Sequence, residues 1–171
     1  MPELLSSWLH LNCLIRLSLG FSKLDENSFP NLMVLRNLCS LNLFKAYEGK
    51  TLCFSVQSFP RLRELFIWDA PQLSQVEIEE GALGSLVELR FAGCPELKRL
   101  PRGIEYLTTL DELYLEDAAD ELIKIIRQEG EANECKEELM KISHIRMVYF
   151  KSTEKNFWRR IVNREGNAFA G

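Results

Sequence analysis

The chain has 171 residues, of which 46% are hydrophobic, and this is enough for one domain with a continuous buried core. Its formal net charge of −4 argues against non-specific binding of nucleic acid or anionic lipid, because such binding requires an excess of basic residues. We therefore expect any partner to be a protein.

The cysteine and sequon patterns indicate a reducing compartment. The five cysteines are odd in number, irregularly spaced and without a Cys-x-x-Cys pair. There is no Asn-x-Ser/Thr sequon, and the leucine-rich start lacks the basic end and unbroken apolar run of a signal peptide. No apolar stretch approaches the length of a membrane span. These features predict a cytoplasmic protein without a transmembrane segment.

A 24-residue repeat organises most of the chain. The pattern Leu-x-x-Leu-x-(Leu/Ile/Phe) recurs with no failed position, and its starts are Leu14, Leu38, Leu62, Leu86 and Leu110. Spacings of three and then two residues do not keep to one face of a helix, but they fit a strand that alternates between core and surface. The pattern predicts parallel strands at 16–19, 40–43, 64–67, 88–91 and 112–115. The fold class is therefore α/β, a leucine-rich-repeat solenoid with a parallel concave sheet.

Small residues occupy the eighth position after every repeat start. They are Ser22, Ala46, Ala70, Cys94 and Ala118. Many leucine-rich repeats place an asparagine here, which closes hydrogen bonds between neighbouring turns. Because asparagine is absent, we expect packing alone to support these turns.

The segments between the strands predict an irregular convex side. In the third repeat, Val76 and Ile78 lie in a strand-like stretch that ends at Gly81. In the fourth repeat, Pro95 and Pro101 flank apolar residues, which suits a short irregular helix or an extended arc.

The repeat stops after the fifth strand. Asp120 is the expected N-cap of a helix that ends before Gly130, followed by a polar loop at 129–138 and a capping strand at 142–150. The last residues are basic, and we expect a mobile tail. This gives three parts: a repeat array at 1–119, a cap at 120–150 and a tail at 151–171.

Large side chains gather at the outward positions of the predicted strands. They are Phe44, Phe66, Trp68, Arg90 and Tyr114. Exposed aromatic and arginine side chains are typical of protein interfaces, so these five form the predicted partner-binding site. Contact with other parts of a longer receptor is the alternative. An acidic column beside them, Glu64, Glu88 and Glu112, is either a solvated face or a patch that selects a basic partner.

The sequence offers little for catalysis. His10 and His144 fall at opposite ends of the array, and Cys94 occupies a turn position where a buried structural cysteine is expected. We therefore predict no enzyme activity, no metal site and no cofactor.

Three segments resemble the C-terminal repeats of plant disease-resistance proteins, the intracellular receptors that carry a coiled coil and an NB-ARC nucleotide switch. They are Ser58-Phe59-Pro60-x-Leu62-x-x-Leu65, Val76-x-Ile78-Glu79-Glu80-Gly81-Ala82-Leu83 and Cys94-Pro95-x-Leu97-x-x-Leu100-Pro101-x-Gly103-Ile104-x-x-Leu107. The resemblance covers roughly residues 8 to 150. It implies a module that recognises pathogen effectors or guarded host proteins and holds the switch inactive until recognition occurs.

The nucleotide switch itself has no counterpart here. No Gly-x-x-x-x-Gly-Lys-Ser/Thr loop occurs, so ADP or ATP binding is carried over to no residue of this chain. The sequence is expected to be a fragment or a truncated gene product. The alternative function is the substrate-recognition repeat domain of an F-box type ubiquitin ligase, which would use the same concave surface.

Overall fold

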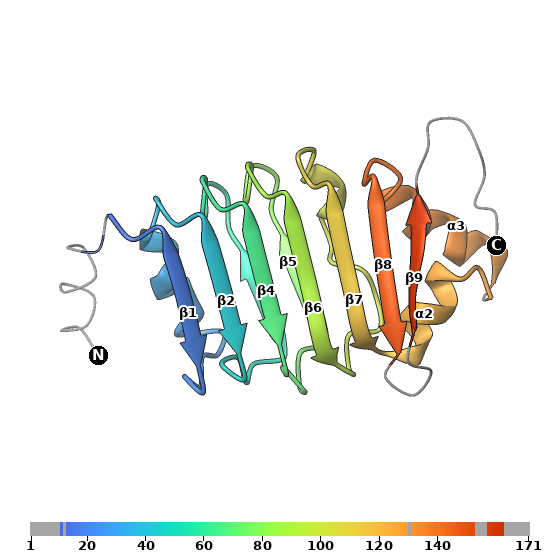
Figure 1. Ribbon diagram of the computed structural model, residues 1–171, viewed down its shortest axis with the longest axis horizontal. Helices are drawn as coiled ribbons and strands as arrows, with labels where there is room; N and C mark the ends of the chain where they lie inside the picture. The colour runs from blue at the N-terminus through green and yellow to red at the C-terminus, as the bar shows by residue number, and fades with distance from the viewer. Residues whose placement is uncertain (1–10, 12, 130, 153–156, 163–171) are drawn as a thin grey trace.

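One large sheet, parallel except for its last strand, forms one face of the molecule, and its strands stand side by side along the long axis (Figure 1). The computed structural model describes residues 11, 13–129, 131–152 and 157–162, with the backbone alone from residue 152 onward. The sheet has seven strands in the order β1-β2-β4-β6-β7-β8-β9. Their bounds are β1 Arg16–Gly20, β2 Ser40–Phe44, β4 Glu64–Trp68, β6 Glu88–Cys94, β7 Glu112–Ala118, β8 Met147–Ser152 and β9 Phe157–Val162.

The first five strands pair in register with a shift of one repeat. Leu17 pairs with Leu41, Leu41 pairs with Leu65, and the row continues through Leu89 and Leu113. The strands lie where the repeat predicts them, and the leucine-rich-repeat solenoid is confirmed.

Residues alternate between core and surface along each strand. In β4, Leu65 and Ile67 are fully buried, whereas the three residues beside them are half-buried on the outer face of the sheet. Because the leucine rows of neighbouring repeats lie directly against each other, they form one continuous core.

The opposite side is less regular, as predicted. Strands β3, Thr51–Phe54, and β5, Gln75–Ile78, form a short parallel pair. The 3-10 helices η2, Phe29–Val34, and η3, Ile104–Tyr106, take their place in other repeats. The strand-like stretch at Val76 and the short helix of the fourth repeat are both confirmed.

A glutamate side chain completes the free edge of β3. The N–H groups of Lys50 and Thr51 donate to Glu26 Oε1 at 2.6 and 3.0 Å. One repeat later, the N–H groups of Ser74 and Gln75 donate to the backbone carbonyl of Lys50. The Glu26 carboxylate therefore replaces a backbone acceptor, and these N–H donors lower its pKa.

Backbone hydrogen bonds link the turns that follow the strands. The N–H of Lys45 donates to the carbonyl of Trp68 at 2.9 Å, and that of Asp69 donates to Ala92 at 2.8 Å. These turn residues have positive φ values of 49° and 51°, as does Gly93 at 64°. The expectation that packing alone supports the turns is wrong, because the left-handed residue directs its N–H toward the next repeat.

The cap consists of α2, Asp120–Ile126, and α3, Ala132–Lys141. The N-cap of α2 is Ala119, not Asp120, and Asp120 lies in the first turn, where its charge favours the helix N-terminus. The polar loop expected at 129–138 is wrong for most of its length. Helix α3 forms there because Cys135, Glu138 and Leu139 bury one face against the array.

The end of the chain also differs from the prediction. The capping strand starts at Met147 rather than at residue 142, and it adds in parallel to β7. Residues 151 and 152 continue β8, and β9 pairs with it in antiparallel orientation. A mobile tail is therefore wrong for these residues, because ladder hydrogen bonds hold them. Residues 153–156 and 163–171 lie outside the described part.

Polar contacts join the cap to the array. The N–H of Leu100 donates to Glu138 Oε2 at 3.3 Å, and Lys141 pairs with the other oxygen of this buried carboxylate. Arg146 donates twice to Asp111, at 2.8 and 2.6 Å, and these bonds lower the pKa of the Asp111 carboxyl. The cap is thus held by side chains that reach back to earlier repeats.

Replacing Leu65 with aspartate is expected to unfold the array. The change places an unpaired carboxylate at a fully buried position, which costs at least about 3 kcal/mol, and each repeat depends on its neighbours. Thermal unfolding followed by circular dichroism measures the effect. Thr108→Asp, at an exposed turn, is the control, and a normal melting temperature for Leu65→Asp would refute the register.

Replacing Glu138 with alanine is expected to loosen the cap without unfolding the repeats. The Leu100 N–H loses its acceptor in a buried place, which costs about 1–3 kcal/mol. Hydrogen exchange should become faster at Leu100 and through α3. Glu137→Ala changes an exposed residue of the same helix and should leave this exchange unchanged; equal exchange in both variants would contradict the role given to Glu138.

Candidate binding surface

The outer face of the large sheet carries the five predicted site residues. In register, Asn42 pairs with Phe66, Phe66 with Arg90, and Arg90 with Tyr114. Phe44 pairs with Trp68 in a second row two residues further along each strand. The five side chains therefore lie on one face, and we call them the aromatic stripe.

Arg90 is held at the centre of the stripe. Its guanidinium carbon lies 4.1 Å from the ring centroid of Tyr114 and 5.4 Å from that of Phe66. Its Nη2 donates to Glu88 Oε1 at 3.0 Å. A planar cation can stack on rings and bind a carboxylate at the same time, so Arg90 joins three strands.

The stripe continues into the cap strand. The rings of Tyr114 and Tyr149 stack with centroids 4.5 Å apart and an interplanar angle of 9°. The Tyr114 hydroxyl donates to Glu112 Oε2 at 2.6 Å. Beyond them, Lys151 pairs with Glu116 at 3.0 Å. Burial is the main cause that raises the pKa of Tyr114, followed by its bond to Glu112.

Sequence reasoning missed Tyr149 as part of this surface. It follows Tyr114 by 35 residues, so the 24-residue spacing does not reach it. The usable signal was alternation within the predicted capping strand, which places Met147 and Tyr149 on the face opposite to Val148 and Phe150.

The second row of the aromatic stripe, Phe44 and Trp68, is more exposed at its Phe44 end. Phe44 is 40% exposed, its ring meets Phe21 edge to face, and Lys45 Nζ lies 5.5 Å from its centroid. Trp68 is half-buried, and within the described residues its buried Nε1 has no acceptor. The prediction that Trp68 is exposed is therefore only partly correct, because the outward face is itself partly packed.

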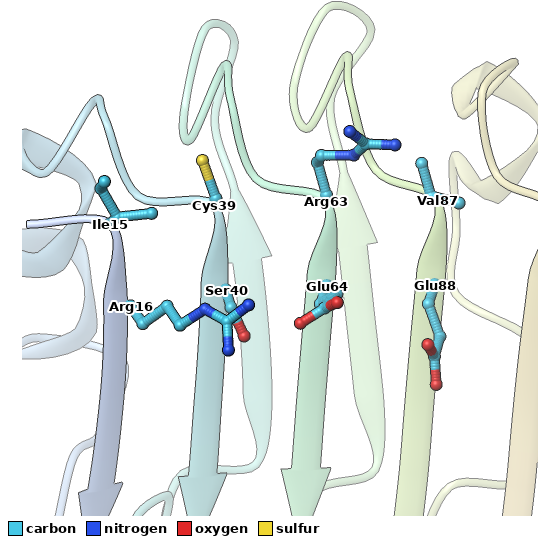
Figure 2. Close-up of a pocket in the computed structure, with 8 residues that line it drawn as sticks. All are labelled: Ile15, Arg16, Cys39, Ser40, Arg63, Glu64, Val87 and Glu88. Carbon is cyan, nitrogen blue, oxygen red and sulfur yellow. The ribbon is translucent and has the colours of Figure 1, made fainter.

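The acidic column lies at the start of the same strands. Glu64 and Glu88, together with Arg16, Ser40 and Arg63, line a groove of about 300 Å³ across the first four strands of the sheet (Figure 2). Glu88 and Glu112 accept from Arg90 and Tyr114. Two of the three glutamates of the column thus accept hydrogen bonds from side chains of the same protein, so the column is not simply a solvated face.

The residues considered for catalysis lie apart from this surface. Cys94 is buried, and burial is the main cause that raises the pKa of its thiol to about 12, which fits a structural cysteine. The His144 ring lies 3.1 Å from the carbonyl oxygen of Leu107, and His10 is outside the described residues. Across the described residues, no group of three His, Cys, Asp or Glu side chains is placed to hold a metal ion. No helix in that part of the chain is long and apolar enough to cross a membrane.

Fold and surface together define a leucine-rich-repeat solenoid with a partly packed aromatic face. No family model matches the chain. It is similar to the disease resistance protein RPM1 of Arabidopsis thaliana, with 34% identity over 159 residues, 91% of this chain and 16% of that protein. It is also similar to the Arabidopsis thaliana disease resistance protein RPP8, with 32% identity over 138 residues, 80% of this chain and 14% of that protein.

The chain is homologous to the leucine-rich-repeat portion of plant NB-LRR disease resistance proteins. It spans only 14% to 16% of the length of the relatives named above. The resemblance noted in the third and fourth repeats therefore extends over most of the chain.

Trp68→Ala is expected to remain folded. Its side chain is half-buried on the outer face, so its loss should cost about 1–2 kcal/mol. Phe91→Ala removes a fully buried ring on the neighbouring strand and should cost about 3–5 kcal/mol. Urea unfolding of the two variants compares them, and an equal or larger loss for Trp68→Ala would place its side chain in the core.

Proposed function

We propose that this chain is a protein-recognition and autoinhibitory module that acts in the defence response to pathogens in the cytoplasm. Its partner is a pathogen effector, a guarded host protein or the NB-ARC domain of the same receptor. Homology to the repeat portion of disease resistance proteins supports the setting. The proposed role is binding rather than catalysis, and residues 1–119 with the cap at 120–150 would act as one unit.

The aromatic stripe is the observation that carries this proposal. Strands lie about 4.8 Å apart, so its rows span a patch roughly 15 to 20 Å long, enough for the core of a standard interface. Arg90 and Tyr114 are already fixed by contacts inside the chain. Such fixed side chains lose little conformational freedom on binding, which favours affinity.

No observation favours the F-box alternative. The relatives reported above are named as disease resistance proteins, and none is named as a ubiquitin ligase component. The binding surface in the two hypotheses would be the same, so the sheet by itself does not discriminate between them.

Combined Phe66→Ala and Trp68→Ala changes in a full-length receptor that carries this segment are expected to weaken partner binding by about 2 kcal/mol or more. Loss of an effector contact would silence the response. Loss of an internal contact would instead cause a response without a pathogen. A cell-death assay with and without the effector separates the two outcomes.

Val56→Ala is the control, because Val56 is 58% exposed and belongs to the turn after β3, away from the large sheet. If the double variant behaved like Val56→Ala in binding and in both assays, the stripe would be an ordinary surface and the site assignment would be wrong.

A further inference from the structure

One glutamate of the acidic column lacks the partner that its neighbours have. Arg90 donates to Glu88 at 3.0 Å, and in both β6 and β7 the donor follows its glutamate by two residues. On β4 the corresponding residue is Phe66, which has no donor. The backbone N–H of Glu64 donates to the carbonyl of Cys39, but within the described residues the half-buried Glu64 carboxylate accepts no hydrogen bond and forms no ion pair.

Arg90 shows which group satisfies a carboxylate on this face. Its guanidinium pairs with Glu88 while it stacks against the rings of Tyr114 and Phe66. Lys45 gives a second case of a cation over a ring of this sheet, at 5.5 Å from Phe44. Cations over aromatic rings, with a carboxylate at hand, are thus a recurring arrangement of the surface.

A groove borders Glu64 on the side of β2, and the Arg16 side chain extends into it over Ser40 (Figure 2). The register partners of Glu64 and Phe66 on β2 are Ser40 and Asn42, which have short side chains. The groove of about 300 Å³ opens above Ser40, and Glu64 lines it on the adjacent strand (Figure 2). A guanidinium that took the place of Arg16 there would meet the Glu64 carboxylate. Phe66 does not line the groove, but it follows Glu64 by two residues on the same face of β4, as Arg90 follows Glu88 on β6.

We propose that Glu64 and Phe66, with Ser40 as the floor, bind an arginine side chain of a partner protein. This inference rests on the proposed function, because it assigns a ligand group to one end of the aromatic stripe. The carboxylate selects a cation, and the ring favours the planar guanidinium over an ammonium group. The partner's arginine would repeat, one strand pair away, the contacts that Arg90 makes inside the chain.

Arg16 competes for the same carboxylate. Its side chain extends from β1 over Ser40 toward β4 (Figure 2), and it makes no ion pair with Glu64 within the described residues. Removing its charge should therefore strengthen binding of an external arginine. If the groove instead bound an anion, the same change would weaken binding.

The test is a titration of the ¹⁵N-labelled 171-residue chain with the peptide acetyl-Gly-Arg-Gly-amide, followed by NMR. Shift changes are expected at residues 40, 64 and 66, and binding should fall for the lysine peptide and vanish for the citrulline peptide. Glu64→Gln should weaken binding by about tenfold and Arg16→Gln should strengthen it by about threefold.

Glu80→Gln is the matched control, since it removes one negative charge at an exposed residue outside the large sheet. Phe66→Leu keeps an apolar side chain but removes the ring, and it should weaken arginine binding while the spectrum stays dispersed. Equal binding of the arginine and citrulline peptides, or equal effects of Glu64→Gln and Glu80→Gln, would overturn the proposal.

The two proposals fail in different ways. If the peptide does not bind, but Phe66→Ala with Trp68→Ala still weakens a partner in the full-length receptor, the arginine site is wrong and the binding surface stands. If the peptide binds at Glu64 and the receptor variants have no effect, the site exists but the proposed function of the stripe is wrong.

Discussion

The stacking of leucine rows in a common register is the constraint on which the rest of the structure depends. A single repeat buries its leucines on one side only, so its core is completed by the repeats before and after it. Leu41, Leu65 and Leu89 are at most 1% exposed because each lies between equivalents one repeat away. Any shift of one residue would turn this row to solvent, since strand side chains alternate between two faces.

The same register builds the surface. Once the leucines are fixed inward, the residues between them must point outward, and equivalent residues of successive repeats must be neighbours. Phe66, Arg90 and Tyr114 are distant in sequence, yet they lie in contact because they occupy one position of the repeat. Residues that are 24 positions apart in the sequence therefore lie next to one another on adjacent strands and form a continuous row.

The sequence predicts this regular part well because its information is local and repeated. Strand positions and the face of each site residue follow from the spacing of the leucines. The cap does not repeat, and its evidence is long-range. Helix α3 is polar apart from a few buried residues, and it is tied to the array by the bond from Leu100 to Glu138, 38 residues apart. No pattern of composition or spacing reveals such a contact.

The sequence predicts that five side chains share the outer face, but it does not predict the contacts that join them. The sequence shows that Arg90 and Tyr114 face outward, whereas their bonds to Glu88 and Glu112 depend on side-chain rotamers. Tyr149 was missed for the same reason as α3, because it enters from outside the repeat. The replacement of a backbone acceptor by Glu26 is likewise visible only when the two neighbouring turns are compared in space.

The hydrogen bonds from Arg90 to Glu88 and from Tyr114 to Glu112 also explain how this aromatic face remains compatible with water. A row of exposed rings alone would favour aggregation, but here Arg90 and Tyr114 each donate to a glutamate of their own strand. The charges of Arg90 and Glu88 neutralise each other, so this pair adds little attraction for a partner at long range. Discrimination must then come from the positions where the pattern is broken. On β4 a phenylalanine takes the place of a donor and leaves Glu64 without one among the described residues, and this makes the first half of the stripe chemically different from the second.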